Sequence, residues 1–160
     1  MFLTRMHGTG VVVAAVLAMA AVAETPANLI PEHIRRNAPD FSLQDSGGST
    51  VQLSNYKGKV VLLDFWATWC HGCKTEIPWY VQFQKKYREQ GLAAVGVSMD
   101  DGWTPVRQFL ADNKINYPIV IGSDDVIMLY KIKNMPVTFL IDKNGKISLS
   151  RKAALGESLS

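Results

Sequence analysis

The sequence has few cysteines and no concentration of charge. It contains two cysteines in 160 residues, and its 17 basic and 14 acidic residues are scattered without a run of five like charges. Such a chain offers no charged patch for nucleic acid, so we expect no nucleic-acid partner. Repeats are also absent, and 160 residues with 48% hydrophobic content can form one domain with a core, but not two. We therefore expect one domain. We also expect the protein to be a monomer, although length and composition do not determine this.

Long apolar runs are also absent. The longest covers the fourteen residues Gly10 to Ala23, follows Arg5 and His7, and ends in the small-x-small pattern Ala-Val-Ala. A membrane span needs roughly 20 apolar residues. The run therefore predicts a cleaved signal peptide over residues 1–23, with an uncleaved anchor as the alternative. Export predicts a periplasmic location, where conditions are oxidising and the two cysteines can form a disulfide.

The first half of the remaining chain predicts a linker or arm, a hairpin and two buried strands. Residues 24–37 contain two prolines and no periodicity, so a domain over residues 38–160 follows a linker or N-terminal arm. Two short alternating segments flank Gly47-Gly48, which can supply the positive φ angles of a hairpin turn. Continuous apolar runs are typical of strands buried on both faces, and a helix between them makes the strands parallel. The hairpin segments are 41–44 and 50–53, and the apolar runs are 60–67 and 92–99.

The second half predicts the edge of the same sheet. A helix over 104–114 should begin with Thr104 as N-cap and Pro105 at its first position. A strand over 117–122 and a short helix over 123–133, capped by Ser123 or Asp124, follow. Residues 136–150 then form two strands joined at Asn144-Gly145, a strong hairpin signal. The fold class is α/β, with a mixed central sheet that is parallel at its centre, antiparallel at one edge and flanked by helices.

Both cysteines lie where a buried strand gives way to a helix. The exposed N–H groups and the dipole at the helix start favour a thiolate at Cys70, which makes it the candidate nucleophile. Cys73 lies on the same face of the first turn, close enough to attack a mixed disulfide formed at Cys70. If His71 between them is protonated, its charge further favours the Cys70 thiolate. We therefore predict that the two cysteines interconvert reversibly between a dithiol and a disulfide, in a two-electron reaction.

Three other uses of the cysteines have less support. A structural disulfide closing so small a loop would remove little entropy from the unfolded chain. A zinc site needs four ligands, and only His33 and His71 are available besides the cysteines. Covalent haem attachment requires histidine directly after the second cysteine, where this chain has Lys74. We therefore expect no metal and no cofactor other than the Cys70–Cys73 disulfide.

Two motifs together carry a family resemblance. The segment "VVLLDFWATWCHGCK" (60–74), followed by "NMPVTFLIDKNG" (134–145), resembles the thioredoxin superfamily. The opening "APDFSL" (38–43) and its hairpin narrow the resemblance to the exported TlpA/ResA-like thiol-disulfide oxidoreductases. The resemblance covers residues 38 to 150 and implies a thioredoxin-like fold with an N-terminal β-hairpin.

The resemblance also implies roles for residues around the cysteines. Cys70 matches the attacking cysteine, Cys73 the resolving cysteine and Trp69 the tryptophan that flanks the site. Met135-Pro136 matches the cis-proline peptide that packs beside the disulfide and presents backbone to an extended substrate.

Two acidic residues are further candidates. Asp64 matches the buried carboxylate that takes the proton of the resolving thiol, and burial within an apolar strand should raise its pKa, which suits a general base. The alternative is that Asp64 faces solvent at the strand end. Glu76 matches a glutamate associated with proton control, although an acid in the first helical turns is also favourable to the dipole. Trp66, Trp79 and Tyr80 are expected to serve packing, without a chemical role.

The sequence departs from the family in two places. His71-Gly72 separates the cysteines, whereas the family usually has proline at the second place, so the helix start should be less rigid and the direction of electron flow stays open. The sequence stops at "LGESLS", where the family continues into a closing helix. We therefore expect a short or missing C-terminal helix. Either the chain is truncated, or its stability is reduced and its melting temperature is low for this class.

The expected function is reduction of disulfides in client proteins, such as apocytochrome c or an oxidase assembly factor, with electrons from a membrane thiol donor. A thiol peroxidase is one alternative, because "APDFSL" openings also occur in peroxiredoxins. Their P-x-x-x-[TS]-x-x-C pattern is not met, since position 63 is leucine and Thr68 lies two residues before Cys70. A copper-binding assembly module that uses both thiolates as soft ligands is the other alternative.

Overall fold

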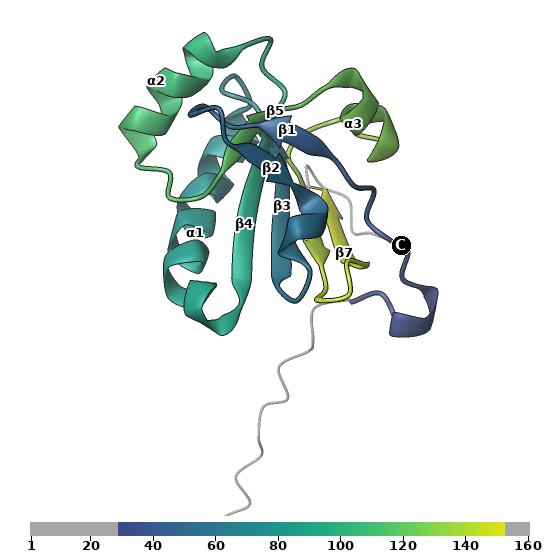
Figure 1. Cartoon of the computed structure of the whole chain (residues 1–160). Coiled ribbons are helices and arrows are strands. Elements are labelled where there is room, and N and C mark those ends of the chain that lie inside the picture. Colours follow the sequence, from purple (N-terminus) through teal and green to yellow (C-terminus); the bar gives the residue numbers. More distant parts are fainter. Residues whose placement is uncertain (1–28, 153–160) are drawn as a thin grey trace, which may run out of the picture.

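The computed structural model describes residues 29–152. The signal peptide expected over residues 1–23 and the segment after residue 152, including the short or missing C-terminal helix, lie outside this range. Figure 1 shows a central sheet with helices and a small hairpin packed against it. No helix within residues 29–152 is long and apolar enough to cross a membrane.

The described chain forms seven strands, three α-helices and three short 3-10 helices. The strands are β1 (Ser42–Gln44), β2 (Thr50–Gln52), β3 (Val60–Trp66), β4 (Leu92–Ser98), β5 (Ile119–Ile121), β6 (Val137–Ile141) and β7 (Ile147–Lys152). The α-helices are α1 (His71–Tyr87), α2 (Trp103–Asn113) and α3 (Asp124–Leu129), and the 3-10 helices are η1 (Glu32–Ile34), η2 (Leu53–Tyr56) and η3 (Arg88–Gln90).

The main sheet has the strand order β5-β4-β3-β6-β7. Strands β3, β4 and β5 run parallel, while β6 and β7 are antiparallel to their neighbours. The mixed sheet with a parallel centre and an antiparallel edge is therefore confirmed. The separate two-stranded sheet is the predicted N-terminal hairpin, β1 with β2.

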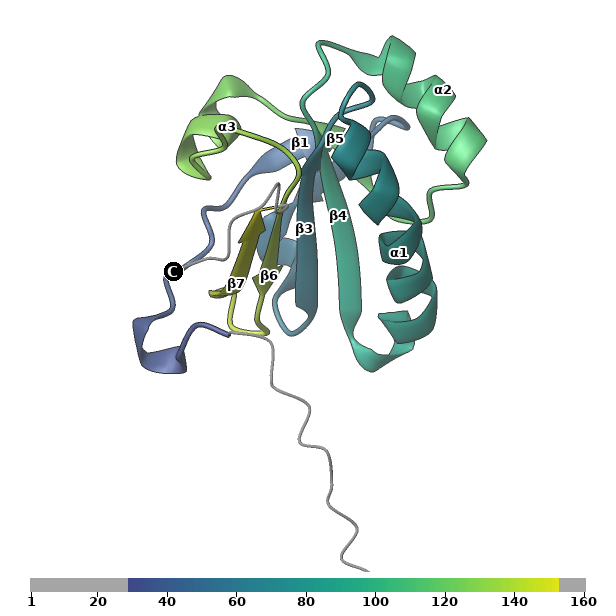
Figure 2. The same ribbon diagram turned by 180° about the vertical axis from the view of Figure 1, so that it is seen from behind.

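Alternate residues of each strand contribute to opposite faces of the sheet, because side chains alternate along a strand. Helices α1 and α2 cover one face, and the hairpin and α3 cover the other, as the two opposite views show (Figures 1 and 2). In β3, Val61, Leu63 and Phe65 pack under the hairpin and α3, whereas Leu62 and Trp66 pack under α1 and α2. Asp64 falls between Leu62 and Trp66, so the pleat directs it toward the α1 face.

Helix α1 is positioned by residues at helical spacing. Ile77, Tyr80 and Gln84 are buried against the sheet. The Gln84 side-chain oxygen accepts a 2.7 Å hydrogen bond from the backbone N–H of Ala94 in β4. The chain then turns into β4 through Gly91, whose φ of 91° is a left-handed conformation that suits glycine.

The predicted start of α2 is wrong by two residues. The helix begins at Trp103 after Gly102, and no side chain caps it, so Thr104 is not the N-cap and Pro105 occupies the third position. Proline fits there because the first four N–H groups of a helix have no partner within the helix. A rule that places proline at the first helical position therefore cannot distinguish a helix that begins at Trp103 from one that begins at Pro105.

The two hairpin turns and α3 differ in detail from the prediction. Only Gly48 of the Gly47-Gly48 pair has a positive φ. Ile141 pairs with Ile147, so the second turn spans residues 142–146 rather than two residues, with Gly145 at a φ of 78°. Ser123 caps α3 as predicted, by accepting from the N–H of Val126. The helix ends at Leu129 rather than 133.

Residues 30–37 form an arm along the sheet edge. The backbone N–H of Ile30 donates to the carbonyl of Ser148 at 2.8 Å, and the N–H of Ile147 donates to the carbonyl of Arg36 at 2.8 Å. The Arg35 side chain forms a 3.0 Å salt bridge with Asp142 in the β6–β7 turn. The described part of the segment predicted as a linker or arm is therefore attached to β7.

Candidate active site

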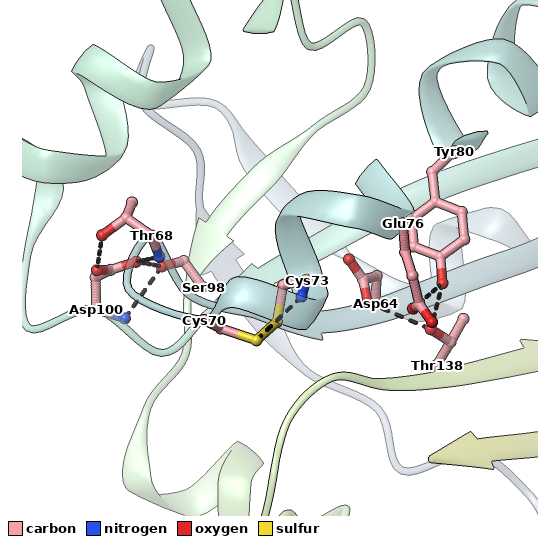
Figure 3. Close-up of a disulfide and its surroundings, with 9 residues drawn as sticks. All are labelled: Asp64, Thr68, Cys70, Cys73, Glu76, Tyr80, Ser98, Asp100 and Thr138. Carbon is pink, nitrogen blue, oxygen red and sulfur yellow. Dashed lines mark hydrogen bonds between the residues drawn. A yellow bond between two sulfur atoms is a disulfide. The ribbon is translucent and has the colours of Figure 1, made fainter. Parts of the chain in front are cut away.

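The two cysteines form a disulfide at the end of β3, where α1 begins (Figure 3). Their sulfur atoms are 2.05 Å apart. Cys70 is the N-cap of α1, and its sulfur accepts a 3.2 Å hydrogen bond from the backbone N–H of Cys73. Cys70 is 8% exposed and Cys73 is 1% exposed. The sulfur that an attacking group reaches first is therefore that of Cys70, which also has the helix N-terminus to stabilise a thiolate.

A polar cluster fixes the loop in front of Cys70. The carboxylate of Asp100 accepts hydrogen bonds from the backbone N–H of Thr68 at 2.9 Å, the Thr68 hydroxyl at 2.6 Å and the Ser98 hydroxyl at 2.7 Å. The backbone N–H of Met99 also donates to the Trp66 carbonyl at 2.8 Å. These contacts join the ends of the parallel strands β3 and β4. These contacts were not predicted from the sequence, although polar residues after two adjacent parallel strands are a recognisable signal.

Replacing Asp100 with alanine is expected to lower the free energy of unfolding by about 2–4 kcal/mol, because three donors lose a charged acceptor. Urea denaturation of the oxidised protein measures this change. The control is Asp101→Ala at the exposed neighbouring position, which should stay within about 0.5 kcal/mol of the parent. Equal effects of the two replacements would contradict the role of the Asp100 cluster.

The residues expected to flank the disulfide do lie around it. Trp69 is 68% exposed directly before Cys70, and His71 and Gly72 are exposed in the first turn of α1. The Met135-Pro136 peptide bond is cis, as the resemblance implied. A Cβ atom on Gly72 would lie 3.2 Å from Cδ of Pro136, so the proline ring packs against Gly72, the second of the two residues between the cysteines. Met135 packs against the core cluster that contains both cysteines.

Asp64 is buried on the α1 face of the sheet. It is 1% exposed, so the alternative in which it faces solvent is wrong. Burial, and next the negative charge of Glu76, raise the pKa of Asp64 to about 8, while a hydrogen bond from Thr138 opposes this rise. Thr138 is its direct cross-strand partner on β6, and the Thr138 hydroxyl donates to Oδ1 of Asp64 at 3.3 Å. Asp64 can therefore change its protonation state near neutral pH, as a general base requires.

Glu76 is connected to Asp64 through two hydroxyl groups. The Tyr80 hydroxyl is hydrogen-bonded to Oε2 of Glu76 at 2.8 Å and lies 2.8 Å from the Thr138 hydroxyl. Figure 3 shows the four side chains forming a connected group beside the disulfide. Tyr80, expected to serve packing only, thus has a polar partner on each side. The four-residue spacing of Glu76 and Tyr80 on a helix could have indicated one contact, whereas Thr138 required the strand register.

Metal-ligating side chains are not grouped in the described region. Between residues 29 and 152, no three His, Cys, Asp or Glu side chains lie together in a way that could hold a metal ion.

Comparisons with known proteins agree with this geometry. The AhpC/TSA family model matches residues 34–150. The thiol-disulfide oxidoreductase ResA of Bacillus subtilis (strain 168) is 36% identical over 124 residues, which are 77% of this chain and 69% of that protein.

Solved structures give the same result for the fold. The crystal structure of a candidate thiol:disulfide interchange protein DsbE from Chlorobium tepidum aligns with a TM-score of 0.70 at 39% identity, covering 74% of this chain and 84% of the other. That of StoA from Bacillus subtilis aligns with a TM-score of 0.62 at 27% identity, covering 71% and 87%. The fold is therefore thioredoxin-like, and the Cys-x-x-Cys disulfide is the one expected of thiol-disulfide exchange. The chain belongs to the AhpC/TSA family, and within it to the ResA-like thiol-disulfide oxidoreductases.

Proposed function

We propose that this protein reduces disulfide bonds in client proteins outside the cytoplasm. The observation that carries the proposal is the placement of Cys70. It caps the N-terminus of α1, is more exposed than Cys73, and directly follows Trp69, whose exposed side chain offers a surface for a client chain. A thiolate at this position is stabilised for attack on an incoming disulfide.

The exchange proceeds in two balanced steps. The Cys70 thiolate attacks one sulfur of the client disulfide, so that a Cys70–client bond forms and the first client thiolate leaves. Cys73 then loses its thiol proton to Asp64 and attacks the Cys70 sulfur, which forms the Cys70–Cys73 disulfide and releases the second client thiolate. Two electrons pass to the client, and the protein is left in the disulfide form seen in Figure 3.

Regeneration needs an electron donor. A dithiol that works in an oxidising compartment must be reduced from elsewhere, so we assign this step to a membrane thiol donor. The signal peptide predicted for residues 1–23 supports a periplasmic location. Apocytochrome c and oxidase assembly factors are suitable clients, because cysteines must be free thiols before they can bond covalently to haem or ligate copper.

Insulin provides a direct test of this function. The reduced protein should convert insulin disulfides to thiols with one Cys70–Cys73 disulfide formed per insulin disulfide reduced, and the Cys70→Ser variant should not. Hydrogen peroxide serves as the competing oxidant in a parallel assay. Rapid peroxide consumption with insulin left intact would instead support a thiol peroxidase. Binding of one equivalent of Cu(I), without insulin reduction, would support the copper-binding module.

A further inference from the structure

The chain of oxygen atoms from Asp64 to Glu76 contains one contact more than its hydroxyl protons can fill. Three consecutive contacts join Asp64 Oδ1 to Thr138 Oγ1 at 3.3 Å, Thr138 Oγ1 to the Tyr80 hydroxyl at 2.8 Å, and that hydroxyl to Glu76 Oε2 at 2.8 Å. Each contact needs one hydrogen atom between its two oxygens. Thr138 and Tyr80 have only one hydroxyl proton each, so the third proton must come from a carboxyl group.

We infer that Asp64 and Glu76 hold a single proton between them, and that Tyr80, through Thr138, is the positioning residue that connects them. When Asp64 holds the proton, it donates to Thr138, Thr138 donates to Tyr80, and Tyr80 donates to the Glu76 carboxylate. When Glu76 holds the proton, all three hydrogen bonds reverse, and Thr138 donates to the Asp64 carboxylate. If both carboxyls were ionised, two hydroxyl protons would serve three contacts, and one of the three contacts would contain no hydrogen.

The surroundings of Asp64 favour one shared charge over two. Burial and the negative charge of Glu76 both disfavour an ionised Asp64. The other titratable groups that act on the site are Tyr80 of α1 and Tyr117 in front of β5, and the pKa of each is raised first by burial and next by the Asp64 charge. Strand β4 places Gly96, which has no side chain, opposite Asp64. None of these groups supplies a positive charge. The negative charge on an ionised carboxyl is therefore stabilised by the hydrogen bonds of the hydroxyl chain.

The shared proton deepens the proposed function and rests on it for its purpose. Asp64 must be ionised to accept the proton of Cys73, although an ionised carboxylate is costly to bury. Moving the shared proton to the half-buried Glu76 frees Asp64 for this role while the pair keeps the same net charge. Tyr80 thereby links the buried base to a carboxyl group that water can reach.

Carboxyl-carbon NMR titration of the oxidised protein tests this inference without using thiol chemistry. In the parent protein, the carboxyl signals of Asp64 and Glu76 should both change in one common step, the loss of the shared proton, because the titration steps of a coupled pair belong to the pair and not to either group. In Tyr80→Phe the common step should disappear from the Glu76 signal. The Asp64 step should then move down by about one pH unit, since ionising Asp64 no longer costs a hydrogen bond.

Three further variants separate positioning from packing. Thr138→Val should also remove the common step, but it should raise the Asp64 step, because the ionised carboxylate loses its donor. Thr138→Ser keeps a hydroxyl and should restore the parent titration. Tyr117→Phe is the matched control, since the Tyr117 hydroxyl is buried near Asp64 but has no hydrogen-bond partner among the described residues, and it should keep the common step.

Independent titration of the two carboxyls in the parent protein would overturn the inference. An unchanged common step in Tyr80→Phe would do the same, and the two threonine variants decide the question if Tyr80→Phe fails to fold. Failure to reduce insulin would overturn the proposed function instead, and would leave the titration result in place.

Discussion

Replacing Cys73 with serine is expected to turn the protein into a trap for its clients. The Cys70 thiolate can still attack a client disulfide, but no second thiol is present to release the mixed disulfide. Each protein molecule should therefore hold one client chain through Cys70, and turnover should stop after one event. Mass spectrometry of the trapped species, before and after reduction, measures this directly and identifies the client.

Cys70→Ser is the matched control for the trap. Cys73 is 1% exposed, so it should not form a mixed disulfide when Cys70 is absent. The prediction fails if clients are captured through Cys73 in the Cys70→Ser variant, or if the Cys73→Ser variant captures none.

Asp64→Asn is expected to stabilise the protein as the pH rises. The pKa of Asp64 is raised from 3.8 in a model peptide to about 8 in the folded protein, first by burial and next by the Glu76 charge. Between these two values the unfolded chain has lost the proton while the folded protein keeps it, so stability falls as the pH increases. Asparagine removes this loss. The gain in unfolding free energy should therefore be about 3–5 kcal/mol larger at pH 7.5 than at pH 4.

The same replacement should slow the release of clients. A general base contributes about 100-fold or more to a proton-transfer step, so resolution of the mixed disulfide by Cys73 should slow by about that factor at pH 7. Urea denaturation at the two pH values and single-turnover quenching measure the two effects. Asp112→Asn on the exposed face of α2 is the control and should change neither. A stability gain that is the same at both pH values would argue against a raised Asp64 pKa.

Strand identity could be predicted from the sequence where burial alone decides it. The apolar runs 60–67 and 92–99 became β3 and β4 within a residue of their expected ends, because a strand buried on both faces admits few polar side chains. The start of α2 could not be fixed in this way. Pro105 is compatible with any of the first helical positions, and the extended backbone at Gly102 leaves no sequence signal that chooses between them.

The sequence predicts those parts of the site whose residues are close together along the chain. Cys70 and Cys73 lie within one helical turn, and an acid inside an apolar strand already indicates a raised pKa. The Thr138–Tyr80 bridge could not be predicted with the same means, because it depends on which strands are neighbours and in what register. The pairing of β3 with β6 places Asp64 opposite Thr138. This pairing cannot be read from local sequence patterns.

The reduction potential of the Cys70–Cys73 pair tests the central claim most directly. Equilibration of the protein against glutathione and dithiothreitol buffers, with the thiols counted at each ratio, gives the value. A client reductase should have a potential near or below about −230 mV, in the range of thioredoxin and the glutaredoxins. A value near about −120 mV would make the protein an oxidant, and the absence of a reversible couple would contradict the account altogether.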